Sequence, residues 1–82
     1  MPTGFNQQQV RFRTALLLFL KGTAAPLVLY FEKPNEVYIE FQNILKSGVA
    51  TIIEKDTIGP IKKFTIQSSQ ISAIALQEEQ YV

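Results

Sequence analysis

The chain has 82 residues, with eight basic and seven acidic side chains and a formal net charge of +1. It contains no cysteine and no histidine, which excludes disulfides, thiol nucleophiles, and the commonest general base and transition-metal ligand. A chain of this length forms one small domain, and its balanced charge gives no overall attraction to nucleic acid or to an anionic membrane. We therefore expect no catalytic site, no metal site, no cofactor and no evident small-molecule substrate.

The two ends of the chain are predicted to lie outside the folded domain. Residues 1–9 are polar and show no hydrophobic periodicity, which is typical of a disordered N-terminal tail. Residues 78–82, the segment EEQYV, are predicted to form a frayed C-terminal tail. The single domain is therefore expected to span residues 10–77.

The most apolar part of the chain, residues 13–34, is predicted to be folded protein and not a membrane segment. Lys21, Gly22 and Pro26 lie within it, and a lysine near the centre of a bilayer costs about 2.5–3.5 kcal/mol on insertion scales. The apolar run before Lys21 is also shorter than the core of most signal peptides. We therefore expect a cytoplasmic protein without a membrane span.

This apolar stretch has the alternation expected of a β-hairpin. In residues 10–20 the even positions are nearly all apolar, so one face of a strand is predicted to be buried. Residues 27–31 alternate in the same way, and a short loop containing Gly22 separates the two strands. The side chains predicted to point inward are Leu16, Leu18, Leu20, Leu27, Leu29 and Phe31.

Residues 33–48 are predicted to form an amphipathic helix. Either Asn35 caps its N-terminus or Pro34 is its first residue, and Gly48 ends it. The apolar residues recur with helical spacing and make one stripe that would pack on a sheet. They are Val37, Tyr38, Phe41, Ile44 and Leu45.

Three further strands are predicted over residues 49–55, 61–67 and 71–77, with a turn at 56–60. We describe the order as β-β-α-β-β, an α+β fold in which the helix covers one face of a single antiparallel sheet of four or five strands. The hairpins before and after the helix are expected to meet edge to edge, because neither is stable alone.

Several short segments match one pattern of turns and packing positions. Leu-Lys ends the first strand and Pro-Leu begins the second, Ser-Gly ends the helix, and Ser-Gln-Ile-Ser-Ala leads into the last strand. The residues concerned are Leu20, Lys21, Pro26, Leu27, Gln42, Ile44, Ser47, Gly48, Ser69, Gln70, Ile71, Ser72 and Ala73.

Over residues 14–77 this pattern resembles a family of small uncharacterised cyanobacterial proteins with β-β-α-β-β order. The resemblance implies a cytoplasmic domain and no particular activity, since none is assigned to the family. A cysteine common in the third strand of the family is absent from this chain, and so is a basic stretch after the second strand.

The first hairpin is apolar on both faces. If its inward set faces the helix, the other face carries Leu17, Phe19, Val28 and Tyr30, which a domain with one helix cannot cover. Such a patch, on the order of several hundred Å², marks an interaction site. We therefore predict a non-catalytic protein-interaction module that self-associates through these residues, most simply as a homodimer. The alternative is a sheet that curls and buries both faces, as small barrels do.

A second prediction is a small RNA-binding or single-stranded nucleic-acid-binding domain, in which basic side chains surround Phe19 and Tyr30. The candidate basic residues are Arg11, Arg13, Lys21, Lys62 and Lys63.

The carboxylates and serines of the chain do not form a pattern that indicates catalysis. Glu36 and Glu40 share one face of the predicted helix, where solvation explains them. Glu54 and Asp56 flank a turn and are too few for a specific divalent-cation site.

Overall fold

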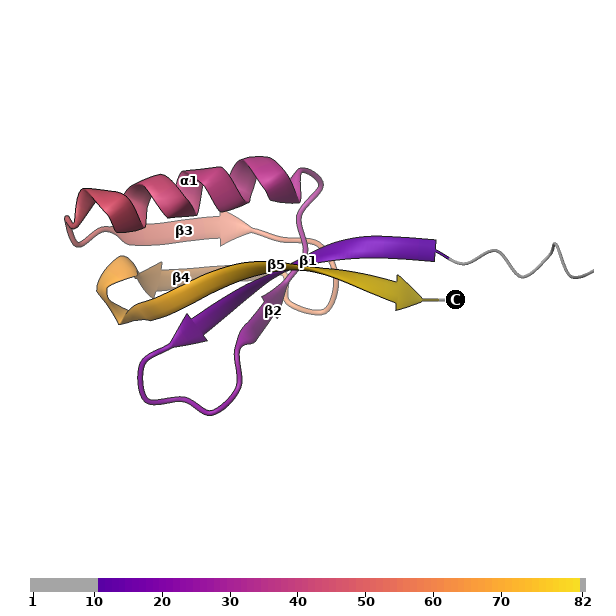
Figure 1. Cartoon of the computed structure of the whole chain (residues 1–82), viewed down its shortest axis with the longest axis horizontal. Helices are drawn as coiled ribbons and strands as arrows, with labels where there is room; N and C mark the ends of the chain where they lie inside the picture. The colour runs from indigo at the N-terminus through magenta and orange to yellow at the C-terminus, as the bar shows by residue number, and fades with distance from the viewer. Residues whose placement is uncertain (1–10, 82) are drawn as a thin grey trace, which may run out of the picture.

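The computed structural model describes residues 11–81 and shows an α+β fold with one helix and two antiparallel sheets (Figure 1). The predicted N-terminal tail, residues 1–9, lies outside the described residues. The elements are β1 (Arg11–Leu20), β2 (Leu27–Leu29), α1 (Pro34–Ser47), β3 (Ile52–Asp56), β4 (Lys63–Gln67), a 3-10 turn (Ser68–Gln70) and β5 (Ile71–Tyr81). Within residues 11–81 no helix combines the length and the apolar character needed to cross a bilayer.

The predicted α+β class is confirmed, but the prediction of a single sheet is wrong. One sheet has the strand order β2-β1-β5, and the other consists of β3 and β4. β2 pairs with only Leu16–Leu18 of β1, whereas β5 pairs with β1 from Arg11 to Leu20. The long β1 therefore takes its main partner from the C-terminal end of the chain, and the two predicted hairpins meet only at one isolated bridge, between Tyr30 and Ile58. The observed order is β-β-α-β-β-β.

β5 is also longer than predicted. It continues to Tyr81, so residues 78–81 of the predicted frayed tail are paired with the start of β1, and residue 82 lies outside the described residues. Arg13 stands opposite Glu79 in this pairing, and opposite charges across an antiparallel pair are favourable. This pairing is absent from the sequence-based prediction, in which no strand is expected beside the first residues of β1.

The core lies between the two sheets and the helix. Its fully or nearly fully buried residues are Leu16, Leu18, Leu29, Phe41, Ile53 and Ile71. All of the side chains predicted to point inward from the first hairpin, and all of the predicted helix stripe, belong to this cluster or pack against it. The Phe64 ring of β4 lies 6.3 Å from the rings of both Phe31 and Phe41, measured between centroids, and so connects the second sheet to the helix.

The helix begins and ends where backbone chemistry favours it. Pro34 is the first helical residue, as one of the two predicted alternatives required, and no side chain caps the N-terminus. Gly48 adopts the left-handed conformation at φ 72°, and its N–H donates to the carbonyl of Leu45. A residue with a side chain would be strained at this position, so Gly48 ends the helix as predicted.

Candidate interaction surface

The three-stranded sheet has one face turned away from the core. We call this the outer face and define it by the side chains at its centre, Leu17, Phe19, Val28, Ala73 and Ala75. Leu17 of β1 lies between Val28 of β2 and Ala75 of β5, and Phe19 stands opposite Ala73. None of these five residues belongs to the core cluster or packs against it. The predicted division of the first hairpin into two faces is therefore confirmed.

The four predicted surface residues differ in exposure. Leu17 is only 9% exposed because its cross-strand neighbours cover it, whereas Phe19 is 37% exposed. Val28 and Tyr30 are half-buried. Of the four predicted residues, Phe19 is therefore exposed, Val28 and Tyr30 are partly covered, and Leu17 is buried.

Tyr30 is held at one end of the outer face by side chains from two other strands. Its hydroxyl donates a hydrogen bond to Oε1 of Glu79 at 2.8 Å, and Nε of Arg13 donates to the same oxygen at 3.2 Å. The Arg13 guanidinium carbon lies 4.2 Å from the centroid of the Tyr30 ring, a cation–π distance. Because β1 lies between β2 and β5, Tyr30 crosses β1 to reach Glu79. The side chain of Ala15 is fully buried and small, which leaves room for this crossing.

This arrangement raises the pKa of Tyr30 above its ordinary value, chiefly because the phenol donates its proton to the Glu79 carboxylate. Partial burial raises the pKa further, and the positive charge of Arg13 opposes the shift. Tyr30 is therefore a neutral hydrogen-bond donor at physiological pH, and its structural role is to join β2 to β5.

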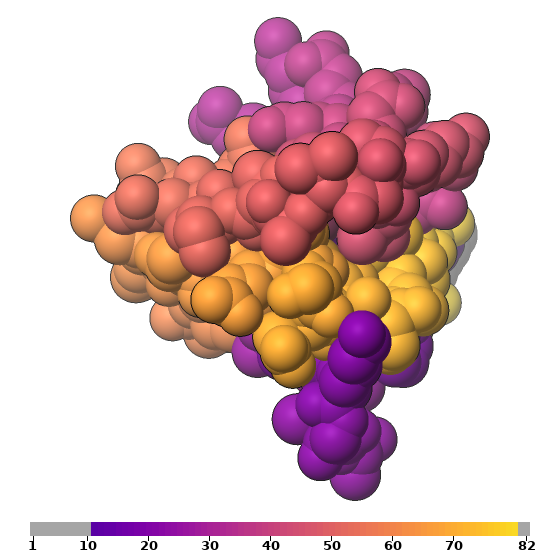
Figure 2. All heavy atoms as spheres, turned by 90° about the vertical axis from the view of Figure 1, so that its left-hand side faces the viewer, coloured from indigo at the N-terminus to yellow at the C-terminus, as the bar shows by residue number. Residues whose placement is uncertain are grey.

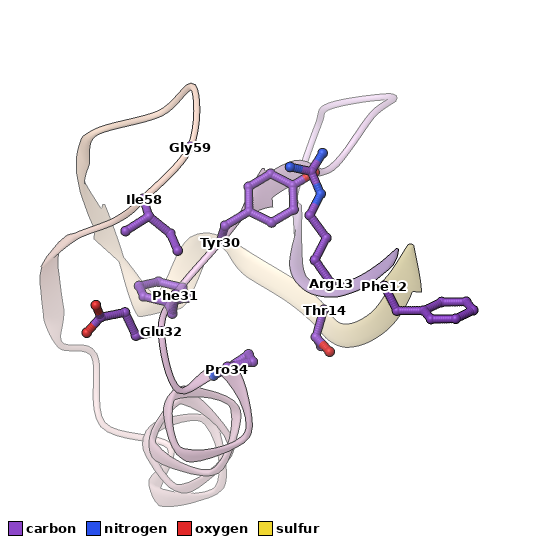
Figure 3. Close-up of a pocket in the computed structure, with 9 residues that line it drawn as sticks. All are labelled: Phe12, Arg13, Thr14, Tyr30, Phe31, Glu32, Pro34, Ile58 and Gly59. Atoms are coloured by element: carbon purple, nitrogen blue, oxygen red, sulfur yellow. The ribbon is translucent and has the colours of Figure 1, made fainter. Parts of the chain in front are cut away.

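The same tyrosine forms one wall of an open cavity of about 470 Å³ (Figure 3). We call this cavity the edge groove; its lining includes Phe12, Arg13, Thr14, Tyr30, Phe31 and Ile58. Gly59, at φ 88°, lies against the Tyr30 ring so closely that an added Cβ would sit 2.8 Å from Cδ2. Only glycine allows the turn between β3 and β4 to approach the ring in this way.

The predicted basic residues are not gathered in one place. Arg11 and Arg13 lie at the start of β1, while Lys21 follows its end, about 26 Å beyond Arg13 for eight residues of extended strand. Lys63 is the first residue of β4 in the other sheet, where it stands opposite Asp56, and Lys62 immediately precedes that strand. In Figure 2 the loop of residues 21–26 projects from the body of the molecule.

Besides Glu79, one other carboxylate forms an ion pair between elements of the described structure. Glu40 of the helix pairs with Nζ of Lys55 on β3 at 2.8 Å, which links α1 to the second sheet. Within the described part of the chain, no three acidic side chains come together in a group that could hold a metal ion.

Sequence reasoning missed three residues of this surface. Glu79 falls within the predicted tail, Gly59 lies in the predicted turn, and Phe12 is one of the even positions of the first strand for which no role is predicted. The sequence did hold a signal for Glu79. Arg13 near the start of the first predicted strand and Glu79 near the C-terminus carry opposite charges, as cross-strand neighbours in an antiparallel pair often do. The contact between Gly59 and Tyr30 had no signal in the sequence.

Comparisons with known proteins return no match: no family model, no curated protein and no solved structure is similar to this chain. The resemblance to small cyanobacterial proteins therefore stays a prediction.

Proposed function

We propose that the chain is a non-catalytic protein-interaction module of the cytoplasm that self-associates as a homodimer through its outer face. The main support is that the centre of the outer face is apolar, although the core lies on the opposite face of the same sheet. Phe19 is 37% exposed there, and exposing a large apolar side chain to water is energetically unfavourable. Burying this face against a second molecule would remove Phe19 and Val28 from water.

A second copy of the chain is the partner that fits this face best. Its five defining residues carry no charge, so two copies related by a two-fold axis would meet without like-charge repulsion. Ala73 and Ala75 stand opposite Phe19 and Leu17 and are small, so a large side chain of a second copy could pack over them. The Phe19 ring of one copy would pack over these alanines in the other.

Light scattering coupled to size-exclusion chromatography tests the proposal. We expect the wild-type chain to elute at twice its 9.3 kDa mass at micromolar concentration, and Phe19→Asp to elute as a monomer. Ile39→Asp is the matched control, because Ile39 is exposed as well, at 53%, but lies on the helix. A wild-type monomer, or a dimer that Phe19→Asp leaves intact, would refute association through this face.

The nucleic-acid alternative has less support. A single-strand binder needs a continuous basic track beside its stacking aromatics, and the candidate cations lie at separate ends of two sheets. Arg13 is also in contact with the Glu79 carboxylate. Fluorescence anisotropy of a labelled oligonucleotide at low salt tests it, and we expect no saturable binding.

A further inference from the structure

The second sheet has an open edge along β4. This strand pairs with β3 on one side, and within residues 11–81 no strand lies on its other side. Figure 2 shows the second sheet, in orange, at one margin of the molecule. An edge strand whose backbone groups have no partner is a template on which another strand can pair.

Two hydrogen bonds at the ends of the β3–β4 ladder show which way the backbone of β4 points. The N–H of Ser68 donates to the carbonyl of Thr51 at 2.8 Å, and the N–H of Thr57 donates to the carbonyl of Lys62 at 2.9 Å. Both pairs belong to the register in which β3 and β4 pair. Because backbone groups alternate along a strand, the even-numbered residues of β4 bond to β3, and the odd-numbered residues point to the open edge.

The odd-numbered and even-numbered residues of β4 also differ in their side chains. The odd-numbered residues, Lys63, Thr65 and Gln67, have exposed side chains. The even-numbered residues, Phe64 and Ile66, are half-buried and pack against the core. No described residue forms a backbone hydrogen bond with the odd-numbered set from the open side. The edge therefore offers the N–H and C=O groups of three residues to another chain.

The sequence of β4 is complementary to itself in an antiparallel pairing. With a two-fold axis at Thr65, this residue stands opposite the same threonine of a second copy, Lys63 stands opposite Gln67, and Phe64 opposite Ile66. No like charges meet, and threonine pairs and aromatic–β-branched pairs are favourable across strands. The three residues with open backbone groups all fall in hydrogen-bonded pairs, each of which exchanges two bonds.

Other pairings of the two small sheets are less favourable. A parallel pairing in register, or an antiparallel one centred on Lys63, brings the same lysine of two copies together. A pairing centred on Phe64 sets the apolar Ile66 opposite Lys62. The edge of β3 does not replace that of β4, because a pairing centred on Glu54 would oppose two carboxylates.

We propose that the open edge of β4 binds the same edge of a second copy, in an antiparallel pairing centred on Thr65. The two small sheets then form one sheet of four strands, in the order β3-β4-β4-β3. Phe64 and Ile66, which are half-buried in one chain, cover each other across the axis. This edge belongs to the second sheet, so it is separate from the outer face, and it joins two outer-face dimers into a larger assembly.

The pairing is expected to be weaker than the outer-face dimer. An interface between two strands of five residues is small, and small interfaces are typical of weak, transient complexes. We therefore expect it above micromolar concentration. Phe19→Asp disables the outer face, so this variant isolates the edge of β4 in the full chain.

Cysteine cross-linking tests the register, because the chain contains no cysteine of its own. Thr65→Cys and Gln67→Cys, both at exposed positions, are introduced separately into the Phe19→Asp chain and oxidised with oxidised glutathione. In the proposed pairing the two Cα atoms at Thr65 lie about 5.5 Å apart, within the range of disulfides, whereas those at Gln67 lie about 13 Å apart along the strands. We expect dimers to form about tenfold faster with Thr65→Cys. Equal rates, or faster cross-linking with Gln67→Cys, overturn the proposal.

A charge variant tests the pairing without a covalent bond. Thr65→Lys stands opposite Glu54 within the chain, which favours the fold, but it sets two lysines at the axis between copies. Thr65→Val is the matched control, since it keeps a β-branched residue without charge. In the Phe19→Asp chain at millimolar concentration, we expect sedimentation equilibrium to show self-association about fivefold weaker for Thr65→Lys than for Thr65→Val. Equal association of the two contradicts pairing at this edge.

The two proposals fail separately. A wild-type chain that is monomeric at micromolar concentration refutes the outer-face dimer and leaves the tests of the β4 edge unchanged. A Phe19→Asp chain that stays monomeric at millimolar concentration overturns the β4 pairing and leaves the outer-face dimer in place.

Discussion

The hydroxyl of Tyr30, the residue that follows β2, donates a 2.8 Å hydrogen bond to Glu79 on β5, across the intervening strand β1. The two residues are 49 positions apart in the chain. Their contact joins the edge strands of the three-stranded sheet and separates the apolar centre of the outer face from the edge groove.

Tyr30→Phe removes this hydrogen bond and keeps the ring. We expect the free energy of unfolding to fall by about 1–2 kcal/mol, because the lost bond has a charged acceptor. Urea denaturation monitored by circular dichroism measures the change. Glu79→Gln is the control, since its amide oxygen still accepts from Tyr30, and it should cost less than Tyr30→Phe. An unchanged midpoint for Tyr30→Phe would show that the bond does not stabilise the fold.

The raised pKa of Tyr30 predicts a loss of stability at alkaline pH. The folded chain holds the phenol proton more tightly than the unfolded chain, whose tyrosine pKa is near 10.0. The stabilisation is therefore complete below pH 10 and is lost as the pH rises through the folded pKa. We expect the difference in unfolding free energy between wild type and Tyr30→Phe to shrink above pH 10. A difference that grows over this range would contradict the assigned hydrogen bond.

Gly59→Ala should destabilise the fold more than Gly22→Ala. Both glycines have positive φ, but an added Cβ at Gly22 meets nothing within 4 Å, whereas at Gly59 it would contact the Tyr30 ring at 2.8 Å. We expect a cost of about 1 kcal/mol for the backbone strain at Gly22, and a larger cost at Gly59. Thermal unfolding of the two variants compares them. Equal melting temperatures would mean that the ring moves away without cost.

Leu29→Ala tests whether the first hairpin is part of the shared core. Leu29 is fully buried, and truncating such a residue costs about 2–5 kcal/mol. Ile39→Ala is the control on the exposed face of the helix and should change stability by about 0.5 kcal/mol or less. Chemical denaturation measures both, and similar losses for the two would contradict the assigned core.

The parts of the fold that follow from local pattern were predictable. Period-two alternation placed Leu16, Leu18 and Leu29 in the core, and helical spacing did the same for Phe41. Gly48 and Pro34 set the ends of the helix through backbone preferences that hold in any context.

The pairing of strands was not predictable in the same way. The alternation in β5 shows which of its faces is buried, but it does not show which strand lies beside it. The choice of β1 over β4 depends on long-range contacts, and the 3-10 turn Ser68–Gln70 redirects the chain between β4 and β5. The edge groove forms from three segments that are distant in sequence, around Phe12, Tyr30 and Ile58, so no local pattern indicated it.

The most direct test of the proposed dimer is a measurement of contacts between two copies. Mixing 13C,15N-labelled chain with unlabelled chain and recording isotope-filtered nuclear Overhauser spectra selects contacts between molecules. We predict cross-peaks that connect the methyl groups of Val28 in one copy with the Phe19 ring of the other. Cross-peaks that involve Ile39 or Ile52 instead, or none at a concentration where the dimer is populated, would contradict self-association through the outer face.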